Sequence, residues 1–309
     1  MKQTLKTLYD IDASALIKYT DKVYKIEDSS KNQYCLKYTN CNCKKEIVDK
    51  VKALNMQDSF VMPLPTCIRS INANKDNKTF LVSKWIDDDN VSSKDLKIKY
   101  YLKQIAKLHN QSVYSINVSF SYYNEICMSI EEKIEECYQK YENIIYEVER
   151  KEYKSPFEWY FISFYNQIIK SLDESRANLD KLKSLTKDKS TQNMAITHQN
   201  FSYDHVFILN DKIIGNDKMT LNTPLFDLIS LFNNVEFGTI DLSKLLNEYF
   251  SIMKYEDYEI KWLLTLLFIP KVLVITDNEF NNINQLMQIL FKIKSVFELN
   301  ESLNLDKEK

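Results

Sequence analysis

The stretch THQNFSYDHVFILNDKIIGND, Thr197–Asp217, decides how the rest of this chain is interpreted. It begins with a His beside a short polar run and continues through two apolar runs of β type joined by a turn. It then reaches Gly215, at a point where a site of this layout needs a carboxylate. The stretch therefore has the layout of a catalytic loop followed by a hairpin, with changed residues at the chemical positions.

Composition indicates an ordinary globular chain with a hydrophobic core. Its 309 residues are 44% hydrophobic and 27% charged, and the formal net charge is −2. This length suits one large domain or two modest ones. A net charge so close to zero gives no strong attraction to nucleic acid or to an anionic membrane, so we expect no nucleic-acid partner.

Two residue types exclude or weaken several classes of site. Only two glycines occur, Gly215 and Gly238, so neither a dinucleotide-binding G-x-G-x-x-G nor a Walker-type G-x-x-x-x-G-K-[ST] motif is present. The six cysteines include one C-x-C pair, Cys41 and Cys43, without a second pair at zinc-finger spacing. We interpret them as reduced thiols, with a metal site as the less favoured alternative.

The apolar runs are short. The N-terminal residues contain no apolar core of signal-peptide length, and the longest apolar stretch, Trp262–Ile269, is too short to span a bilayer. We therefore expect no membrane span and a cytoplasmic protein.

The first 90 residues predict a small antiparallel sheet with one helix. Four apolar runs predict strands, at 24–26, 33–38, 68–71 and 79–85. Residues 44–56 predict a helix, because Ile47, Val51 and Leu54 recur on one helical face.

The rest of the chain is mainly helical in pattern. An acidic, then Ser-rich segment between Trp85 and Ser93 predicts a hinge and a helix cap. The helix after it would turn four apolar residues inward, namely Leu102, Ile105, Ala106 and Leu108. Helical patterns then cover 124–185, with a new helix beginning at Pro156, and much of 224–300. Between them lies the hairpin, which we expect to turn near Asn210 and Asp211.

Four motifs of this chain occur together in one family of kinases. They are YCLKY around Lys37, LKQIAKLH at 102–109, VFILNDKII at 206–214 and TPLFDLISL at 223–231. From about residue 15 to 300 the chain resembles the aminoglycoside-phosphotransferase-like kinases, most closely the bacterial spore-coat branch of the CotS type. The resemblance implies an α+β, bilobal, protein-kinase-like fold, with residues 1–86 as the β-rich lobe and residues 87–309 as the larger helical lobe.

The resemblance also implies roles for several side chains. Phosphoryl transfer needs a Lys on the nucleotide phosphates, a carboxylate near the acceptor hydroxyl, and oxygen ligands for Mg²⁺. Lys37 takes the first role, with Glu46 as its candidate ion-pair partner; the alternatives are an exposed strand Lys and a solvated Glu. Asp227 would tie the catalytic loop to the backbone, His198 would hold the loop in shape, and His109 is expected to be a helix-end residue.

All three chemical positions of the loop depart from the family pattern. Asn200 stands at the base position, His205 at the first metal position and Gly215 at the second. Loss of a general base costs about 10²- to 10⁴-fold in rate, whereas loss of the metal carboxylate removes the anchor of the cation. Together the changes predict that phosphoryl transfer is lost.

Two nearby carboxylates are the candidate replacements. Taking Asp204 as the base would put Leu209 at a metal position, where it cannot bind a cation. Asp217 lies where the family often carries a second Asp, and it is the alternative metal ligand.

We therefore expect a catalytically degenerate kinase-like protein of the spore coat, a structural or interaction component with other spore-coat proteins as partners. It would be made in the mother-cell cytoplasm and then deposited in the coat, with no cofactor. The alternative is an active phosphotransferase that moves phosphate from ATP to a hydroxyl of a small molecule, using Mg²⁺ and Asp217.

Overall fold

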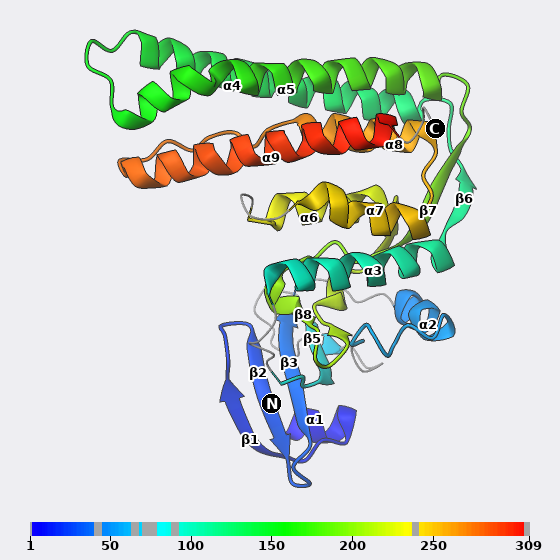
Figure 1. The fold of residues 1–309 in the computed structure, drawn as a ribbon. Helices are drawn as coiled ribbons and strands as arrows, with labels where there is room; N and C mark the ends of the chain where they lie inside the picture. The colour runs from blue at the N-terminus through cyan, green and yellow to red at the C-terminus, as the bar shows by residue number, and fades with distance from the viewer. Residues whose placement is uncertain are drawn as a thin grey trace. The chain divides into compact units, whose positions relative to one another are not determined.

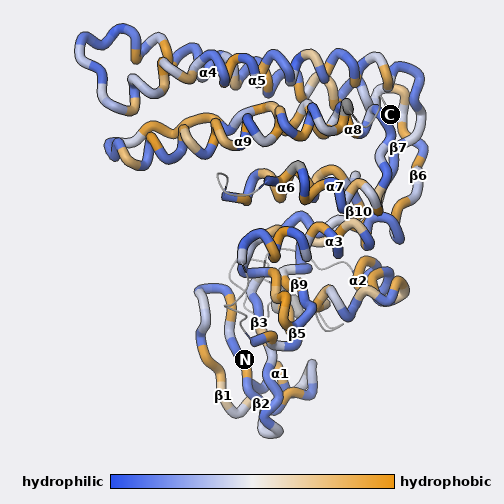
Figure 2. The backbone as a smooth tube through the Cα atoms, viewed as in Figure 1, coloured by the Kyte–Doolittle hydropathy of each residue, from blue (hydrophilic) through white to orange (hydrophobic). Residues whose placement is uncertain are grey.

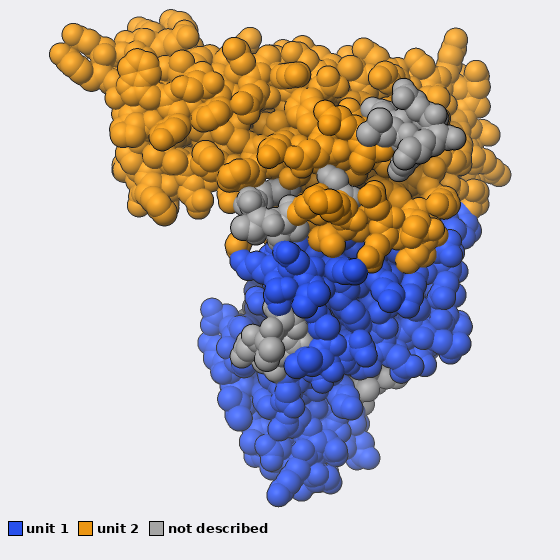
Figure 3. Space-filling view, in the orientation of Figure 1, with its two compact units in different colours: residues 1–114, 194–227 blue, residues 115–193, 228–309 orange. Residues whose placement is uncertain are grey.

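The computed structural model describes residues 2–39, 45–62, 68–69, 79–87, 93–236 and 241–305 (Figure 1). The chain forms two compact units, each built from two segments (Figure 3). Unit 1 comprises Met1–Tyr114 and Met194–Asp227, and unit 2 comprises Ser115–Asn193 and Leu228–Lys309. The two units are compact parts of the chain, and they are not the two lobes that the sequence predicts. The lobe boundary expected between Trp85 and Ser93 therefore stays a prediction.

Unit 1 contains an antiparallel sheet with strand order β1-β2-β3-β5-β4. The strands are β1 (Ala13–Lys18), β2 (Val23–Asp28), β3 (Gln33–Thr39), β4 (Ile68–Arg69) and β5 (Thr79–Lys84). Ile26, Leu36 and Val82 on the three central strands are buried in one hydrophobic cluster. Leu36 and Val82 are direct cross-strand partners, so their side chains share a face of the sheet. The predicted antiparallel sheet is confirmed.

Helices also belong to unit 1. The predicted helix is present as α2 (Lys45–Ala53), which buries Ile47, Val48 and Val51. A further helix, α1 (Lys2–Tyr9), was not predicted from the sequence; its Leu5 joins the core cluster of the sheet.

Helix α3 (Lys94–Ser112) begins where the sequence predicts a cap. The Ser93 side chain accepts a hydrogen bond from the backbone N–H of Leu96. The four residues predicted to face inward are all buried, namely Leu102, Ile105, Ala106 and Leu108. The predicted helical spacing of its apolar residues, and the face that they bury, are confirmed.

The quoted stretch and the residues next to it form short strands and turns, most of them in unit 1. Strand β7 (Thr191–Thr197) leads into the loop, and β10 (Thr220–Asn222) pairs with its last residues. Strands β8 (Val206–Phe207) and β9 (Lys212–Ile213) form the predicted hairpin. Two 3₁₀ turns, η1 (Tyr203–His205) and η2 (Asn216–Lys218), flank that hairpin.

Strand β9 also pairs with the segment that follows α2. Ile213 donates its N–H to the Ser59 carbonyl at 2.7 Å, and Val61 donates to the Ile213 carbonyl at 2.9 Å. Phe60, between them, is fully buried. The segment after α2 is therefore fixed to the backbone that runs into Gly215.

Unit 2 is mainly helical, and strand β6 (Tyr114–Asn117) leads into it. Its described helices are α4 (Tyr122–Glu149), α5 (Pro156–Thr186), α7 (Leu242–Ile252), α8 (Asp257–Phe268), α9 (Glu279–Leu305) and most of α6 (Leu225–Asn234), which begins in unit 1. Hydrophobic and hydrophilic residues alternate along α4 and α5 (Figure 2), as expected of helices with one buried face. The hydroxyl groups of Ser171 and Ser175 on α5 donate to the carbonyls of Phe268 and Thr265 on α8.

Some predictions fall outside the described residues. They are the C-x-C pair at Cys41 and Cys43, and most of the expected hinge, at 88–92. Cys35, Cys127 and Cys137, which are described, are free thiols. Within the described ranges, no helix combines the length and apolar character needed to cross a membrane.

The start of α5 provides a test of local helix signals. The Ser155 side chain accepts a hydrogen bond from the Glu158 N–H, the Glu158 carboxylate accepts one from the Ser155 N–H, and Pro156 occupies the first turn. Replacing Ser155 with Ala should lower the free energy of unfolding by about 1 kcal/mol, measured by urea denaturation.

Ser121 is the matched control for this substitution. It is the N-cap of α4 but makes no side-chain capping hydrogen bond. Ser121→Ala should therefore change stability by less than about 0.5 kcal/mol. Equal losses in the two variants would show that the cap of α5 contributes nothing specific.

Candidate functional site

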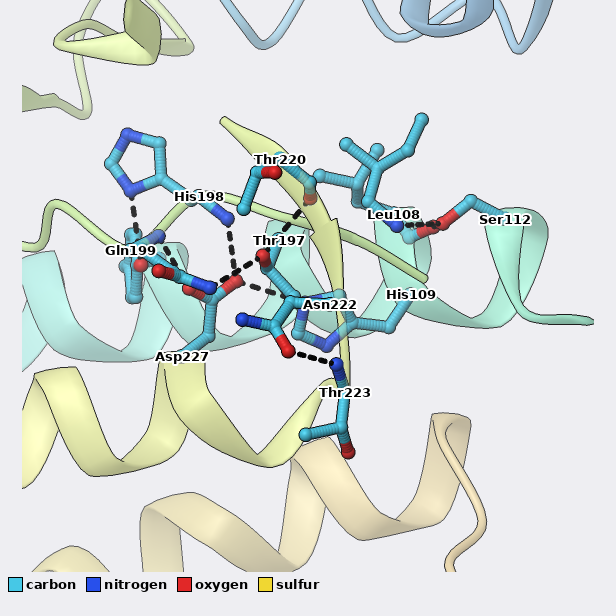
Figure 4. Close-up of polar contacts among 12 residues, drawn as sticks. Leu108, His109, Ser112, Thr197, His198, Gln199, Thr220, Asn222, Thr223 and Asp227 are labelled. Carbon is cyan, nitrogen blue, oxygen red and sulfur yellow. Dashed lines mark hydrogen bonds and ion pairs between the residues drawn. The ribbon is translucent and has the colours of Figure 1, made fainter. Parts of the chain in front are cut away.

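The candidate catalytic loop is held by one buried carboxylate, Asp227 at the start of α6 (Figure 4). Its Oδ2 accepts the N–H of His198 at 2.8 Å, and its Oδ1 accepts the N–H of Gln199 at 2.5 Å. His109 on α3 donates from Nε2 to Oδ2 at 2.9 Å. Asp227 thus contacts the loop backbone in the way that the family resemblance implies.

These contacts allow the Asp227 carboxylate to stay ionised although it is fully buried. Burial opposes ionisation, but the hydrogen bond and charge of His109, together with the loop N–H, outweigh it and lower the Asp227 pKa. His109 was expected to be only a helix-end residue; the structure makes it a buried partner of Asp227. It follows Leu102 by seven residues and Ile105 by four, and this spacing is a sequence signal that could have placed it on the buried face of α3.

His198 fills the space beneath the loop and is fully buried. Its Nε2 lies 3.2 Å from the Ile214 carbonyl, which can only accept, so Nε2 carries the proton. Its Nδ1 then accepts from the Tyr101 hydroxyl at 3.1 Å. Both nitrogens are satisfied in the neutral ring, and burial lowers the His198 pKa to about 4.

The three changed positions of the loop contact one another. The Asn200 side chain donates from Nδ2 to the Gly215 carbonyl at 2.8 Å. The His205 ring places Nδ1 2.8 Å from the Asn200 carbonyl. A Cβ added at Gly215 would stand 2.7 Å from Nδ2 of Asn200 and 2.9 Å from two atoms of the His205 ring. Asn200 and His205 therefore occupy the space next to Gly215 that a side chain there would need.

Gly215 also has a backbone conformation that favours glycine. Its φ and ψ are 77° and 24°, in the left-handed region, where a Cβ meets steric strain. Gly215 follows β9 and precedes η2, so this conformation sets the direction in which Asn216 and Asp217 continue.

Lys37 and Asp217 form an ion pair although 180 residues separate them. The Lys37 Nζ lies 2.7 Å from Oδ1 of Asp217, whose side chain is only 5% exposed, while that of Lys37 is 27% exposed. A buried carboxylate is costly unless it is paired, so Lys37 compensates Asp217 directly. Together with the contacts at Gly215, this pair brings Lys37, Asn200, His205, Gly215 and Asp217 into one site.

Two expected contributors lie outside this arrangement. Glu46 is exposed at the start of α2, and the ion pair formed by Lys37 goes to Asp217 rather than to Glu46. The buried face of α2 is made by its apolar residues, which turns Glu46 toward solvent. Asp204 is also exposed.

Asn216 is a site residue that sequence reasoning missed. It is 3% exposed, and its Nδ2 donates to the carbonyls of Val61 and Ile213, both at 2.9 Å. It therefore holds the segment after α2 against β9, directly beside Asp217. No sequence pattern indicates this role, because Val61 lies 155 residues away along the chain.

The side chains available as ligands determine whether a divalent cation can bind. Among the described residues, no cluster contains three or more His, Cys, Asp or Glu side chains able to hold a metal. Mg²⁺ in nucleotide sites is held by only one or two carboxylates, with phosphates and water completing its shell. Asp217 supplies one carboxylate, and Asn200 has a side-chain carbonyl oxygen. These are the oxygen groups that the described site offers to a cation.

No model of a known protein family and no curated protein matches the chain. Solved structures do match it. An aminoglycoside phosphotransferase from Alicyclobacillus acidocaldarius has a TM-score of 0.71 at 11% identity, covering 100% of this chain and 96% of that chain. AMP-bound spectinomycin phosphotransferase has a TM-score of 0.55 at 15% identity, covering 96% of each chain. The complex of that enzyme with ADP and spectinomycin scores 0.52 at 13% identity, covering 97% of each.

At these identities the matches establish the fold alone. They confirm the α+β, protein-kinase-like fold of the aminoglycoside-phosphotransferase type that the sequence predicts. The spore-coat branch stays an expectation.

The packing around Gly215 can be tested with a double-mutant cycle. Gly215→Ala should lower the free energy of unfolding by about 1–2 kcal/mol from backbone strain, and further from the contact with the His205 ring. In a His205→Ala background the part due to the ring should disappear while the contact with Asn200 Nδ2 stays, giving a coupling on the order of 1 kcal/mol by urea denaturation. The same cycle with Asp204→Ala, at an exposed neighbour, should be additive; equal coupling in both cycles would contradict the proposed contact.

The buried neutral His198 predicts a pH dependence of stability. Its pKa is about 4 in the folded chain against an ordinary 6.5, so between these values the unfolded chain binds a proton that the folded chain does not. Its contribution to stability is therefore complete above pH 6.5 and is lost as pH falls toward 4, by about 3 kcal/mol in all.

The measurement is urea denaturation at several pH values for the wild type and His198→Gln. The variant is expected to be less stable at every pH because it loses contacts of the ring, so the slope between pH 6.5 and 4 is compared. The wild type should show the steeper fall. Parallel curves would mean that His198 titrates alike in the folded and unfolded chains.

Proposed function

We propose that the chain is an ATP-dependent phosphotransferase that acts on a hydroxyl group of a small molecule, with Asp217 replacing the missing metal carboxylate. The observation that carries this proposal is the Lys37–Asp217 pair, at 2.7 Å and with Asp217 buried. Phosphoryl transfer depends mainly on positioning and charge, and this pair keeps a cation for the phosphates and a carboxylate for the metal. The likeness in fold to aminoglycoside and spectinomycin phosphotransferases supports the same reaction class.

Each side chain has a definite capacity in this reaction. The Lys37 ammonium pairs with phosphate oxygens, and Asp217 offers a carboxylate to a divalent cation. When bound, that cation neutralises charge on the transferred phosphoryl group. The Asn200 amide can orient an acceptor hydroxyl but cannot take its proton, so the reaction is slower by about 10²- to 10⁴-fold than with a carboxylate base.

A second function is favoured by a different observation, the contact of Asn200, His205 and Gly215. These residues fill the position of the usual metal carboxylate, as expected of a chain that keeps the fold without the reaction. In this proposal the protein is a catalytically degenerate, structural or interaction component. Its place in the spore coat, with other coat proteins as partners, rests only on the family resemblance.

Asp217→Asn separates the two functions. In the first, the wild type consumes ATP in a Mg²⁺-dependent way and Asp217→Asn lowers the rate at least about 100-fold, because the cation loses its carboxylate. Asp204→Asn, an exposed carboxylate on the same loop, should leave the rate unchanged.

Thermal unfolding with ADP supplies the second readout. A stabilisation of the wild type that requires Mg²⁺, and that Asp217→Asn removes, supports the phosphotransferase. No ATP consumption, together with a stabilisation that is absent or independent of Mg²⁺, would support the degenerate protein instead.

A further inference from the structure

Large aromatic side chains are exposed at one end of the helices of unit 2. The turn between α4 and α5 and the beginning of α9 both lie at this end (Figure 1). The two are in contact there, because the Glu279 carboxylate accepts the Phe157 N–H at 3.0 Å. Five aromatic residues at this end are exposed by half or more. This set, the aromatic end, comprises Tyr146 (57%), Tyr153 (87%), Trp159 (59%), Tyr160 (50%) and Phe280 (76%).

The turn that carries most of these rings is ordered by its own polar contacts. The Glu158 carboxylate accepts the Ser155 N–H at 2.7 Å and pairs with the Lys151 Nζ at 2.5 Å. Lys154 donates from Nζ to the Lys151 carbonyl at 2.7 Å. A turn that is already ordered loses little conformational entropy when a partner covers it. Exposed apolar surface that gathers on such an ordered segment is typical of a binding surface, whereas single exposed residues are not.

Charged side chains of both signs stand among the rings. The Arg150 guanidinium lies 5.2 Å from the centre of the Tyr146 ring. The Lys154 Nζ lies 5.7 Å from the centre of the Trp159 ring. These cation–π contacts hold the two cations beside the rings. The same segment also exposes three carboxylates, namely Glu147, Glu149 and Glu152.

We propose that the aromatic end is an interface with a second copy of this chain, and that a twofold axis relates the two copies. In such an interface the same patch meets itself, so the carboxylates of one copy can face the cations of the other. A patch that carries both signs among exposed rings is suited to this pairing. An anionic membrane would instead select a basic surface, and a strongly charged protein partner a surface of one sign.

The area of the patch is sufficient for a dimer of ordinary size. A buried aromatic side chain removes about 150–250 Å² from water, so the five rings at their exposed fractions present roughly 500–800 Å² per copy. A standard interface buries about 800 Å² per partner. Trp, Tyr and Arg are also the residue types that contribute most to binding at interfaces. The inference is independent of the proposed function, because the aromatic end belongs to unit 2 and the candidate site to unit 1.

The first test is sedimentation velocity of the full chain over about 1–100 μM, a range in which an interface of this size can associate. The wild type should change from monomer to dimer as its concentration rises. Phe280→Ala and Trp159→Ala should each weaken the dimer at least about tenfold, because each change occurs twice in the interface.

Phe120→Ala is the matched control. Phe120 is 88% exposed and precedes α4, about 40 Å along that helix from the aromatic end. This variant should associate as the wild type does. Far-UV circular dichroism checks that each variant is folded, and Phe280→Ala supplies the result if Trp159→Ala is not.

The second test exchanges the charges. One variant, Arg150→Glu with Lys154→Glu, has an acidic aromatic end, and the other, Glu149→Lys with Glu152→Lys, has a basic one. Each variant alone should remain monomeric, because like charges then meet across the twofold axis. An equimolar mixture should form a dimer, because opposite charges meet again. Recovery in the mixture requires two copies that pair through this patch, which a merely destabilised variant would not show.

Several outcomes would overturn the inference. They are a wild type that stays monomeric throughout the range, a dimer that Phe280→Ala and Trp159→Ala leave unchanged, equal weakening by Phe120→Ala, and a mixture of the charge variants that remains monomeric. Co-sedimentation with vesicles of phosphatidylcholine, alone and with phosphatidylserine, tests the other occupant. A monomeric chain that binds these vesicles, and loses that binding in Trp159→Ala, would assign the aromatic end to a membrane surface and refute the dimer.

Discussion

The candidate site depends on the buried carboxylate of Asp227. A charge in this position is tolerated only when its lone pairs are used, and here they accept two backbone N–H groups of the loop and the His109 ring. These contacts fix the path of the loop at His198 and Gln199, where Gln199 adopts a positive φ of 52°. Because the contacts are made to backbone, they hold the loop whatever side chains it carries.

The residues that hold the loop in shape are therefore different from the residues proposed to take part in chemistry. Asp227, His109 and His198 keep the loop in place through buried hydrogen bonds. Asn200 and His205, which stand at chemical positions of the family pattern that the sequence resembles, fill the space beside Gly215. A change of reaction, of metal or of activity altogether is compatible with the same fold.

Asp217 is held from two directions within unit 1. Lys37 on the central strand β3 pairs with its carboxylate, and Asn216 beside it hydrogen-bonds to Val61 and Ile213. The segment after α2 is in turn joined to β9 by backbone hydrogen bonds. The sheet and the loop are thus linked at the residue on which the proposed chemistry depends, so a shift of either would move Asp217.

The sequence by itself determined the elements whose signals are local. Helical spacing identified the inward face of α3, Pro156 marked the start of α5, and the turn between two apolar runs gave the hairpin. The expectation that Lys37, Asn200, His205 and Gly215 share one site came from the family resemblance and not from a physical argument about these residues. Only the tertiary structure decided that Asp217 rather than Glu46 pairs with Lys37, and that α1 completes the core of the sheet. Caps and periodicity involve residues a few positions apart, whereas these partners are chosen by burial and charge between segments that meet only when the chain has folded.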